Sequence, residues 1–155
     1  MNLLALDTSG PVCGVAVMRD GQILSEVMVR NNRTHSANLL PMIDRTLEGA
    51  GMSIGEIDRL AVVVGPGSFT GVRIGVSTAK GLSHGAGLPC VPVNALEALA
   101  EGVRGVDAVL CPIQDARAGQ VYGAAFLGGK RVMEDQPLKL EEYLAAVRAI
   151  HPGAY

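Results

Sequence analysis

The feature that most constrains the fold is an apolar run that leads directly into a glycine-rich loop. Residues 60–64 are Leu-Ala-Val-Val-Val, and Gly65-Pro66-Gly67-Ser68 follows without a break. An apolar run of this length is typical of a strand that is covered on both faces of a sheet. Residues 72–82 then continue with helical spacing and small side chains. A buried strand, a tight turn and a helix in this order predict an α/β fold.

The neighbouring segments extend this unit in both directions. Asp20-Gly21 is a hairpin signal between two strand-like runs, which predicts a three-stranded meander at the start of the chain. Residues 35–51 have helical spacing, but Pro41 lies inside them, so the helix is either bent there or begins later. Asn94 with Glu97 three residues later predicts a capped helix. The expected order is βββαβαβα, with strands at 3–6, 13–18, 23–29, 60–64 and 89–93, the last two buried, and helices at 35–51, 72–82 and 95–99.

A second, smaller lobe is expected after this unit. Residues 102–107 carry two glycines and charged residues, which makes them the best candidate boundary. We therefore expect an N-terminal lobe over 1–103 and a small or incomplete second lobe over 104–155. The elements expected in the second lobe are strands at 108–114 and 120–127 and a helix at 140–150.

Composition and charge exclude several classes of protein. The formal net charge is −2 and the 13 lysines and arginines are scattered, which argues against a chain that holds nucleic acid on its own. No apolar stretch approaches the roughly 18 residues of a membrane span, and the first residues are typical of a strand, not of a signal peptide. The three cysteines have no CxxC spacing, so we expect reduced thiols in buried settings. A cytoplasmic protein without membrane contact is expected.

The glycine loop, together with the end of the first strand, forms a candidate phosphate site. Backbone N–H groups at a helix N-terminus can hold an anion, and Arg73 in the first turn can pair with it or with a neighbouring acid. The loop lacks the lysine of a Walker A motif and the spacing of a dinucleotide fingerprint. A tight turn and a closed hairpin without any ligand are the alternatives. The candidate residues are Asp7, Ser9, Gly65, Gly67, Ser68, Thr70 and Arg73, with Thr70 as the expected helix cap.

The helix expected at 35–51 has a wider apolar face than one core contact requires. The whole chain is also apolar, with 48% hydrophobic residues and a mean hydropathy of +0.30. This surplus is either slack in the protein's own core or a surface that covers another chain.

Several strings of residues, in order over about the first 127 residues, carry a family resemblance. They are Leu4-Ala5-Leu6-Asp7-Thr8-Ser9, His35-Ser36 with Leu39-Leu40-Pro41, the loop string from Gly65 to Gly75, Ala79-Lys80-Gly81-Leu82, and Asp115-Ala116-Arg117 with Val121-Tyr122. Together they resemble the TsaB (YeaZ) family of bacterial tRNA threonylcarbamoyladenosine biosynthesis proteins. The resemblance implies an actin-like ATPase (ribonuclease-H-like) fold. It also implies that the chain is a partner of the catalytic subunit TsaD and the ATPase TsaE. Together, these proteins transfer a threonylcarbamoyl group to adenosine 37 of tRNA.

The resemblance also separates this chain from the catalytic subunit. TsaD-like proteins carry a Val-Asn-His-Leu-Glu-Gly-His pattern whose histidines hold the catalytic metal, whereas this chain has Val93-Asn94-Ala95-Leu96-Glu97-Ala98-Leu99. Ala95 and Leu99 stand at the ligand positions, and neither side chain can bind a transition metal. We therefore expect a non-catalytic subunit without a metal site or cofactor of its own, with ATP and metal held by partner subunits.

A non-catalytic subunit acts by binding, which favours the partner-covering interpretation of the helix face. We expect contact with TsaD and TsaE, a homodimer when the chain is alone, and contact with tRNA only through the complex. The alternative function is a nucleotide-binding enzyme of the actin-like ATPase superfamily that uses the candidate phosphate site. The expected interface residues are Leu39, Met42, Ile43 and Thr46 with Val72, Val76 and Ala79.

Overall fold

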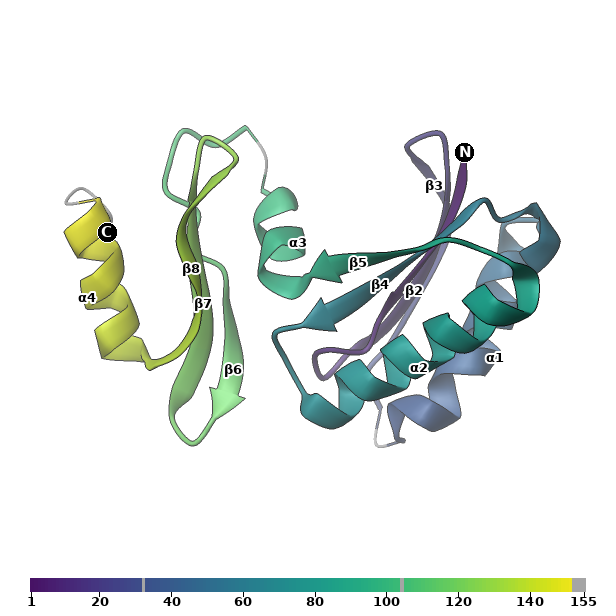
Figure 1. Cartoon of the computed structure of the whole chain (residues 1–155), viewed down its shortest axis with the longest axis horizontal. Helices are drawn as coiled ribbons and strands as arrows, with labels where there is room; N and C mark the ends of the chain where they lie inside the picture. Colours follow the sequence, from purple (N-terminus) through teal and green to yellow (C-terminus); the bar gives the residue numbers. More distant parts are fainter. Residues whose placement is uncertain (32, 104, 152–155) are drawn as a thin grey trace. The chain divides into compact units, whose positions relative to one another are not determined.

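The computed structural model describes residues 1–31, 33–103 and 105–151 and divides them into two compact units (Figure 1). The first unit consists of Met1–Val64 and Ser68–Val93, and the second of Gly65–Gly67 and the chain from Asn94 on. The lobe boundary expected at 103/104 stays a prediction, and the residues from 152 on lie outside the described part of the chain.

The first unit is a five-stranded sheet with the strand order β3-β2-β1-β4-β5. The first three strands form the expected antiparallel meander, and β4 lies parallel to β1, so that Leu4 pairs with Leu60. Asp20 (φ 49°) and Gly21 (φ 85°) make the predicted hairpin turn, because their left-handed conformation matches the twist of the strands. The elements are β1 (Asn2–Asp7), β2 (Cys13–Arg19), β3 (Gln22–Val29), α1 (His35–Gly49), the short helix η1 (Ile54–Glu56), β4 (Arg59–Gly65), α2 (Phe69–Ala86) and β5 (Cys90–Asn94).

Three expectations for this unit need correction. Helix α1 begins at His35 with Pro41 inside it, so a later start is wrong. Strand β4 is buried from Leu60 to Val63, as predicted, while Val64, also expected to be buried, is exposed. Strand β5 is the edge of the sheet, and most of its residues are exposed. An edge strand pairs with a neighbouring strand on one side only, so its residues are less covered than those of a central strand. The apolar sequence does not distinguish the two positions, and the predicted burial of this strand was therefore too high.

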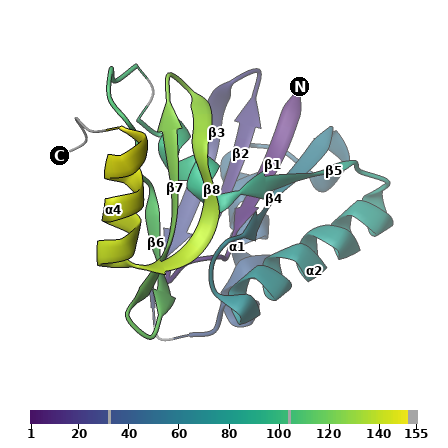
Figure 2. The same cartoon turned by 60° about the vertical axis from the view of Figure 1, so that its left-hand side comes forward.

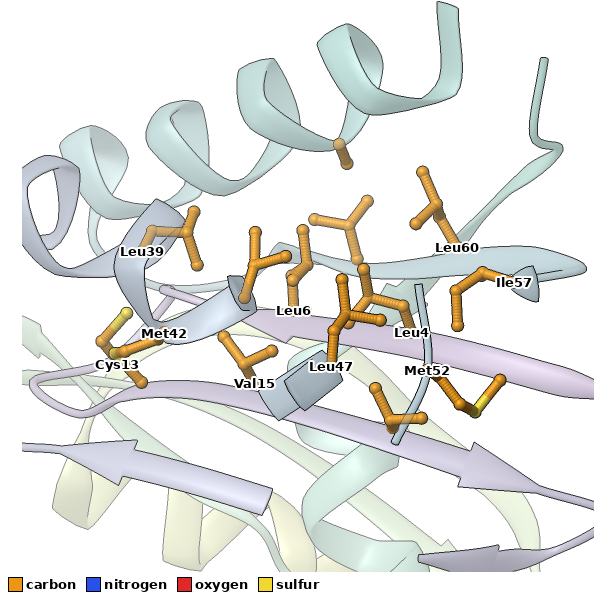
Figure 3. Close-up of a cluster of buried hydrophobic side chains, with 14 residues drawn as sticks. Leu4, Leu6, Cys13, Val15, Leu39, Met42, Leu47, Met52, Ile57 and Leu60 are labelled. Carbon is orange, nitrogen blue, oxygen red and sulfur yellow. The ribbon is translucent and has the colours of Figure 1, made fainter. Parts of the chain in front are cut away.

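The core of the first unit lies between the sheet and helix α1. Figure 3 shows side chains of β1 and β2, such as Leu6 and Val15, packed against Leu39, Met42 and Leu47 of the helix. Every second side chain of β1 and β2 points inward, because side chains alternate between the two faces of a strand. Helix α1 packs against them with one face, on which its buried residues recur every three or four positions. The apolar face of α1 therefore belongs to the core of its own unit.

The second unit is a three-stranded antiparallel sheet with β7 in the centre. The expected strand at 108–114 begins later, and strand β8 was not predicted. It carries charged residues and Pro137 on an exposed edge, so its sequence lacks a clear apolar alternation. The elements are α3 (Ala95–Glu101), β6 (Ile113–Arg117), β7 (Gln120–Leu127), β8 (Lys130–Lys139) and α4 (Leu140–Ile150).

Two helices cover this second sheet. Leu96 of α3 packs with Phe126 of β7, whereas Tyr143 of α4 packs with Ala125, the neighbouring residue that points the other way. Figure 2 shows α4 running beside the sheet. The Tyr143 hydroxyl donates to the Ala124 carbonyl at 2.7 Å. A β-carbon on Gly123 would lie 2.3 Å from the Tyr143 ring, so glycine is required there.

Candidate functional site

The end of β1 forms a closed turn. The Asp7 carboxylate accepts hydrogen bonds at Oδ1 from the Ser9 backbone N–H (2.8 Å) and the Ser9 hydroxyl (2.7 Å). Asx turns of this kind close loops in many proteins. Asp7 Oδ1 and the Ser9 hydroxyl are therefore bonded to each other. Both groups were candidates for holding a phosphate or its metal.

The start of α2 differs in detail from the sequence prediction. Ser68, and not Thr70, is the N-cap, and its hydroxyl accepts from the Gly71 N–H at 3.3 Å. The helix begins one turn earlier than expected, so Thr70 lies inside it. The Arg73 guanidinium lies 4.2 Å from the centre of the exposed Phe69 ring, a cation–π contact. An acidic neighbour for Arg73, the alternative expected from the sequence, is not recorded among the described residues.

The β1–β2 loop and the first turns of α2 touch directly. The buried Thr8 hydroxyl donates to the Gly71 carbonyl at 2.7 Å, and the Ser68 N–H donates to the Ser9 carbonyl at 2.7 Å. A β-carbon on Gly71 would lie 2.0 Å from the Thr8 carbonyl oxygen. Sequence reasoning missed Thr8 and Gly71 as a contact pair, although both lie in the strings that carry the family resemblance. No group as large as a phosphate fits between Thr8 and Gly71.

The two loop glycines of the candidate site lie in a different unit. Gly65 (φ 114°) and Gly67 (φ 156°) have positive φ angles, which explains the choice of glycine. They belong to the second unit, whereas Asp7, Ser9, Ser68, Thr70 and Arg73 belong to the first. Of the candidate residues, the structure joins Asp7, Ser9 and Ser68 by hydrogen bonds.

The residues expected at a partner interface are mostly buried inside the first unit. Thr46 is fully buried, and its hydroxyl donates to the Met42 carbonyl at 2.7 Å. Val72 and Val76 are half-buried on α2. The interface stays a prediction, and most of the buried members of the set contribute to the core of the first unit. The buried members of the set are Leu39, Met42, Ile43, Thr46 and Ala79.

Two other residues of these helices offer large apolar side chains to solvent. Leu40 on α1 is 55% exposed and Phe69 on α2 is 71% exposed. The helical spacing predicts Leu40 on the apolar stripe of α1, and its exposure corrects that prediction. Phe69 lies where a loop was expected.

The stretch 93–99 has structural roles in the second unit. Asn94 caps α3, since its Oδ1 accepts from the N–H groups of Leu96 and Glu97 at 2.9 Å, and its Nδ2 donates to Asp135. Glu97 pairs with Arg131 at 3.0 Å, and Arg131 also pairs with Asp135. Ala95 is buried, and Leu99 is half exposed. The polar residues of this stretch thus fasten α3 to β8.

The Arg131 side chain also borders a hollow of about 750 Å³ beside α3. Its guanidinium lies 4.7 Å from the centre of the Phe126 ring. Within the described residues, no three or more His, Cys, Asp or Glu side chains are grouped so that they can hold a metal ion.

Of the three cysteines expected in buried settings, one has such a setting. Cys13 is buried, while Cys90 and Cys111 are exposed. Burial raises the pKa of the Cys13 thiol, and the nearby Asp7 carboxylate raises it further. None of the described helices has the length and hydropathy needed to cross a membrane.

Among solved structures, YeaZ from Pseudomonas aeruginosa superposes with a TM-score of 0.78 at 33% identity, over 88% of this chain and 67% of that one. Component A of the (R)-2-hydroxyglutaryl-CoA dehydratase of Acidaminococcus fermentans superposes with a TM-score of 0.58 at 15% identity, over 90% of this chain and 48% of that one. At 15% identity, the second match indicates a shared fold and nothing about function. The predicted actin-like, ribonuclease-H-like fold is confirmed.

The sequence comparisons point to the same family. The tRNA threonylcarbamoyladenosine biosynthesis protein TsaB of Bacillus subtilis is 34% identical over 96% of this chain and 66% of its own length. TsaB of Escherichia coli is 42% identical over 81% of this chain and 55% of its own length. This chain thus spans between about half and two thirds of these curated relatives. The family model for TsaD, tRNA N6-adenosine threonylcarbamoyltransferase, matches residues 22–151. The chain therefore belongs to the TsaD family, and within it to the group of TsaB, or YeaZ, proteins.

Proposed function

We propose that this chain is a non-catalytic subunit of the machinery that makes threonylcarbamoyladenosine in tRNA, and that it acts by binding a TsaD-type catalytic subunit. The observation that carries the proposal is the stretch 93–99. At the positions that resemble the metal-binding histidines of TsaD-like sequences, this chain has Ala95 and Leu99. The remaining polar residues, Asn94 and Glu97, are bonded to α3, Asp135 and Arg131. A side chain without a donor atom cannot bind a metal ion.

The hydrogen bonds of the β1–β2 loop support the proposal that this chain does not bind a nucleotide itself. Asp7 and Ser9 bond to each other, and the loop lies directly against Gly71 of α2. A phosphate placed between this loop and the helix would have to break the Thr8–Gly71 and Ser9–Ser68 hydrogen bonds. We accordingly assign ATP and the catalytic metal to the partner subunits, TsaE and TsaD, and place contact with tRNA in the assembled complex.

The docking surface proposed here is the outward side of α1 and α2. It comprises Leu40, Phe69 and Arg73, with the half-buried Val72 and Val76. Phenylalanine and arginine are enriched at protein interfaces, and here the Arg73 guanidinium lies over the exposed Phe69 ring, while Leu40 adds exposed apolar area. When the chain is alone, the same surface serves a homodimer. Both roles place the protein in the cytoplasm, where tRNA is modified.

A reconstituted modification assay tests this proposal. TsaD-type and TsaE-type subunits, substrate tRNA, threonylcarbamoyl-adenylate and ATP are mixed with and without this chain. Formation of modified adenosine only when all subunits are present supports the proposal. Modified adenosine formed at an equal rate without the chain, or formed by the chain alone, contradicts it.

Calorimetry of the isolated chain with ATP and magnesium tests the alternative function. We expect no binding. Micromolar binding accompanied by turnover would identify a nucleotide-using enzyme of the actin-like superfamily instead.

A further inference from the structure

The first turns of α1 and α2 are both bonded to one short loop, Thr8-Ser9-Gly10, called the 8–10 loop below. Thr8 donates to the Gly71 carbonyl, and Ser9 accepts from the Ser68 N–H, each at 2.7 Å. Gly10 accepts from His35 Nε2 at 2.9 Å. Three consecutive residues thus join two helices that are far apart in the sequence.

His35 is the residue that attaches α1 to this loop. Because the Gly10 carbonyl can only accept, Nε2 carries the proton. The other ring nitrogen, Nδ1, is buried and has no hydrogen-bond partner among the described residues. The N-cap residue Thr34 makes no side-chain bond to the helix backbone. The other side-chain bonds recorded for this turn, Thr34 to Ser36 and Asn38 to Asn31, stay within the segment around the helix start. Among the described residues, His35 is thus the residue of this turn that bonds to the 8–10 loop.

On the α2 side, the attachment is a close backbone approach. Gly71 and Gly75 both face Thr8, and β-carbons at these positions would lie 2.0 Å from its carbonyl oxygen and 2.4 Å from its hydroxyl oxygen. Thr8 is fully buried in this contact. The helix cannot shift along the loop without breaking these contacts, so the position of its first turn is fixed.

We propose that His35 is a positioning residue for partner binding, because it fixes the first turn of α1, through the 8–10 loop, relative to the first turn of α2. This inference rests on the proposed function. The two exposed apolar side chains, Leu40 and Phe69, lie on different helices. They serve one interface at full affinity only if their spacing is set before binding, since ordering them afterwards costs binding free energy. His35 does this without touching the partner.

Three variants separate positioning from simple stability. His35→Gln keeps an amide donor near the place of Nε2, His35→Phe keeps a ring without a donor, and His84→Phe is a control in the last turn of α2, where the histidine is exposed. The dissociation constant for a TsaD-type subunit is measured by titration calorimetry. Circular dichroism, recorded at the same temperature, confirms that each variant is folded. Hydrogen exchange follows the amides of α1.

We expect His35→Phe to weaken binding by about tenfold or more, while His35→Gln and His84→Phe stay within about threefold of the unsubstituted chain. Amide exchange should accelerate in the first turn of α1 and not in its last turn. If His35→Phe does not fold, Thr8→Val and Thr8→Ser are compared on the α2 side of the same loop, because valine lacks the hydroxyl donor that serine keeps. Equal affinity of these two variants then overturns the inference.

Two results overturn the inference and are distinct from failure of the proposed function. Equal affinity for His35→Phe and the unsubstituted chain shows that positioning by His35 is not needed. Equal loss in His35→Gln and His35→Phe shows that the hydrogen bond is not the cause. Failure of the unsubstituted chain to bind the TsaD-type subunit overturns the proposed function itself, together with the inference that rests on it.

Discussion

The Thr8 hydroxyl donates to the Gly71 carbonyl at 2.7 Å, and no β-carbon can fit on Gly71, because it would lie 2.0 Å from the Thr8 carbonyl oxygen. In this chain the loop after β1 and the helix after the glycine turn are thus in van der Waals and hydrogen-bond contact. The same two segments carry the residues from which a phosphate site was expected. Their direct contact favours a structural role, and it leads to the first prediction.

Gly71→Ala should lower the free energy of unfolding by about 2–3 kcal/mol, because the added methyl meets backbone and not a flexible side chain. Gly81→Ala in the same helix is the matched control, since nothing lies within 4 Å of the added atom. There the alanine should stabilise the helix by up to about 1 kcal/mol. Urea unfolding followed by circular dichroism measures both. Equal effects of the two substitutions would show that Thr8 and Gly71 are not in close contact.

The cap of α3 provides a second prediction. Asn94→Ala removes the acceptor of two backbone N–H groups and the bond to Asp135, so the second unit should lose about 1–2 kcal/mol. Thr34 stands at the N-cap of α1 without a side-chain bond to the helix backbone, and its hydroxyl bonds to the Ser36 hydroxyl at an exposed site. Thr34→Ala should therefore change the stability by less than about 0.5 kcal/mol. Thermal unfolding of both variants checks the difference. A larger loss for Thr34→Ala would contradict this assignment of the two caps.

Tyr143 should make the second unit sensitive to alkaline pH. Burial, with a further contribution from Cys111, raises the pKa of its phenol well above the ordinary value of about 10. The unfolded chain therefore loses this proton first. The associated stability is complete below about pH 10 and is lost as the pH rises toward the folded-state pKa, by up to about 1.4 kcal/mol per pH unit.

Unfolding measured from pH 8 to pH 11 should show this loss, and Tyr143→Phe should reduce it, because the phenylalanine has no proton to release. The difference between the two curves isolates Tyr143 from the lysines that titrate in the same range. Parallel curves would contradict the assignment of a raised pKa to this buried phenol.

The thiols offer a direct test of burial in both units. Cys90 and Cys111 are exposed and should react with an aromatic disulfide reagent at neutral pH. Cys13 is buried beneath α1 and its pKa is raised, so it should react only after unfolding. Mass spectrometry of the labelled chain, with and without denaturant, distinguishes the three sites. Fast labelling of Cys13 in the folded protein would contradict the packing of β2 against α1.

The meander, the buried strand β4 and the glycine-ended helix α2 could be predicted because their signals are local. A hairpin turn, an apolar run and a left-handed glycine at position 87 each act within a few residues. Strand β8 could not be predicted, since it is a polar edge strand that depends on pairing with β7. Sequence patterns of a few residues therefore predict turns, apolar strands and helix ends, but not a polar strand that forms by pairing with its neighbour.

The candidate site could be predicted only in part. The spacing of Leu39 and Met42 correctly marked one face of α1 as apolar, but spacing does not reveal whether the protein's own sheet or another chain covers that face. The structure assigns the face to the core. The contact of Thr8 with Gly71 joins segments 63 residues apart, so it depends on packing that a sequence pattern does not contain.

Binding has to be tested at exposed positions of α1 and α2, because Met42 is buried in the core. A glutamate in place of Met42 would put a charge into the core and is expected to unfold the first unit, so loss of binding in that variant would be uninformative. Leu40→Glu and Phe69→Glu place the same charge on exposed positions of α1 and α2, and Ile23→Glu, on the exposed edge strand β3, is the control.

The most direct measurement is the affinity of a TsaD-type subunit for the unsubstituted chain and for these three variants, all confirmed to be folded. We expect a stable complex for the unsubstituted chain and for Ile23→Glu, and binding weakened by about tenfold or more in Leu40→Glu and Phe69→Glu. No complex with the unsubstituted chain, or unchanged affinity in both helix variants, would contradict it.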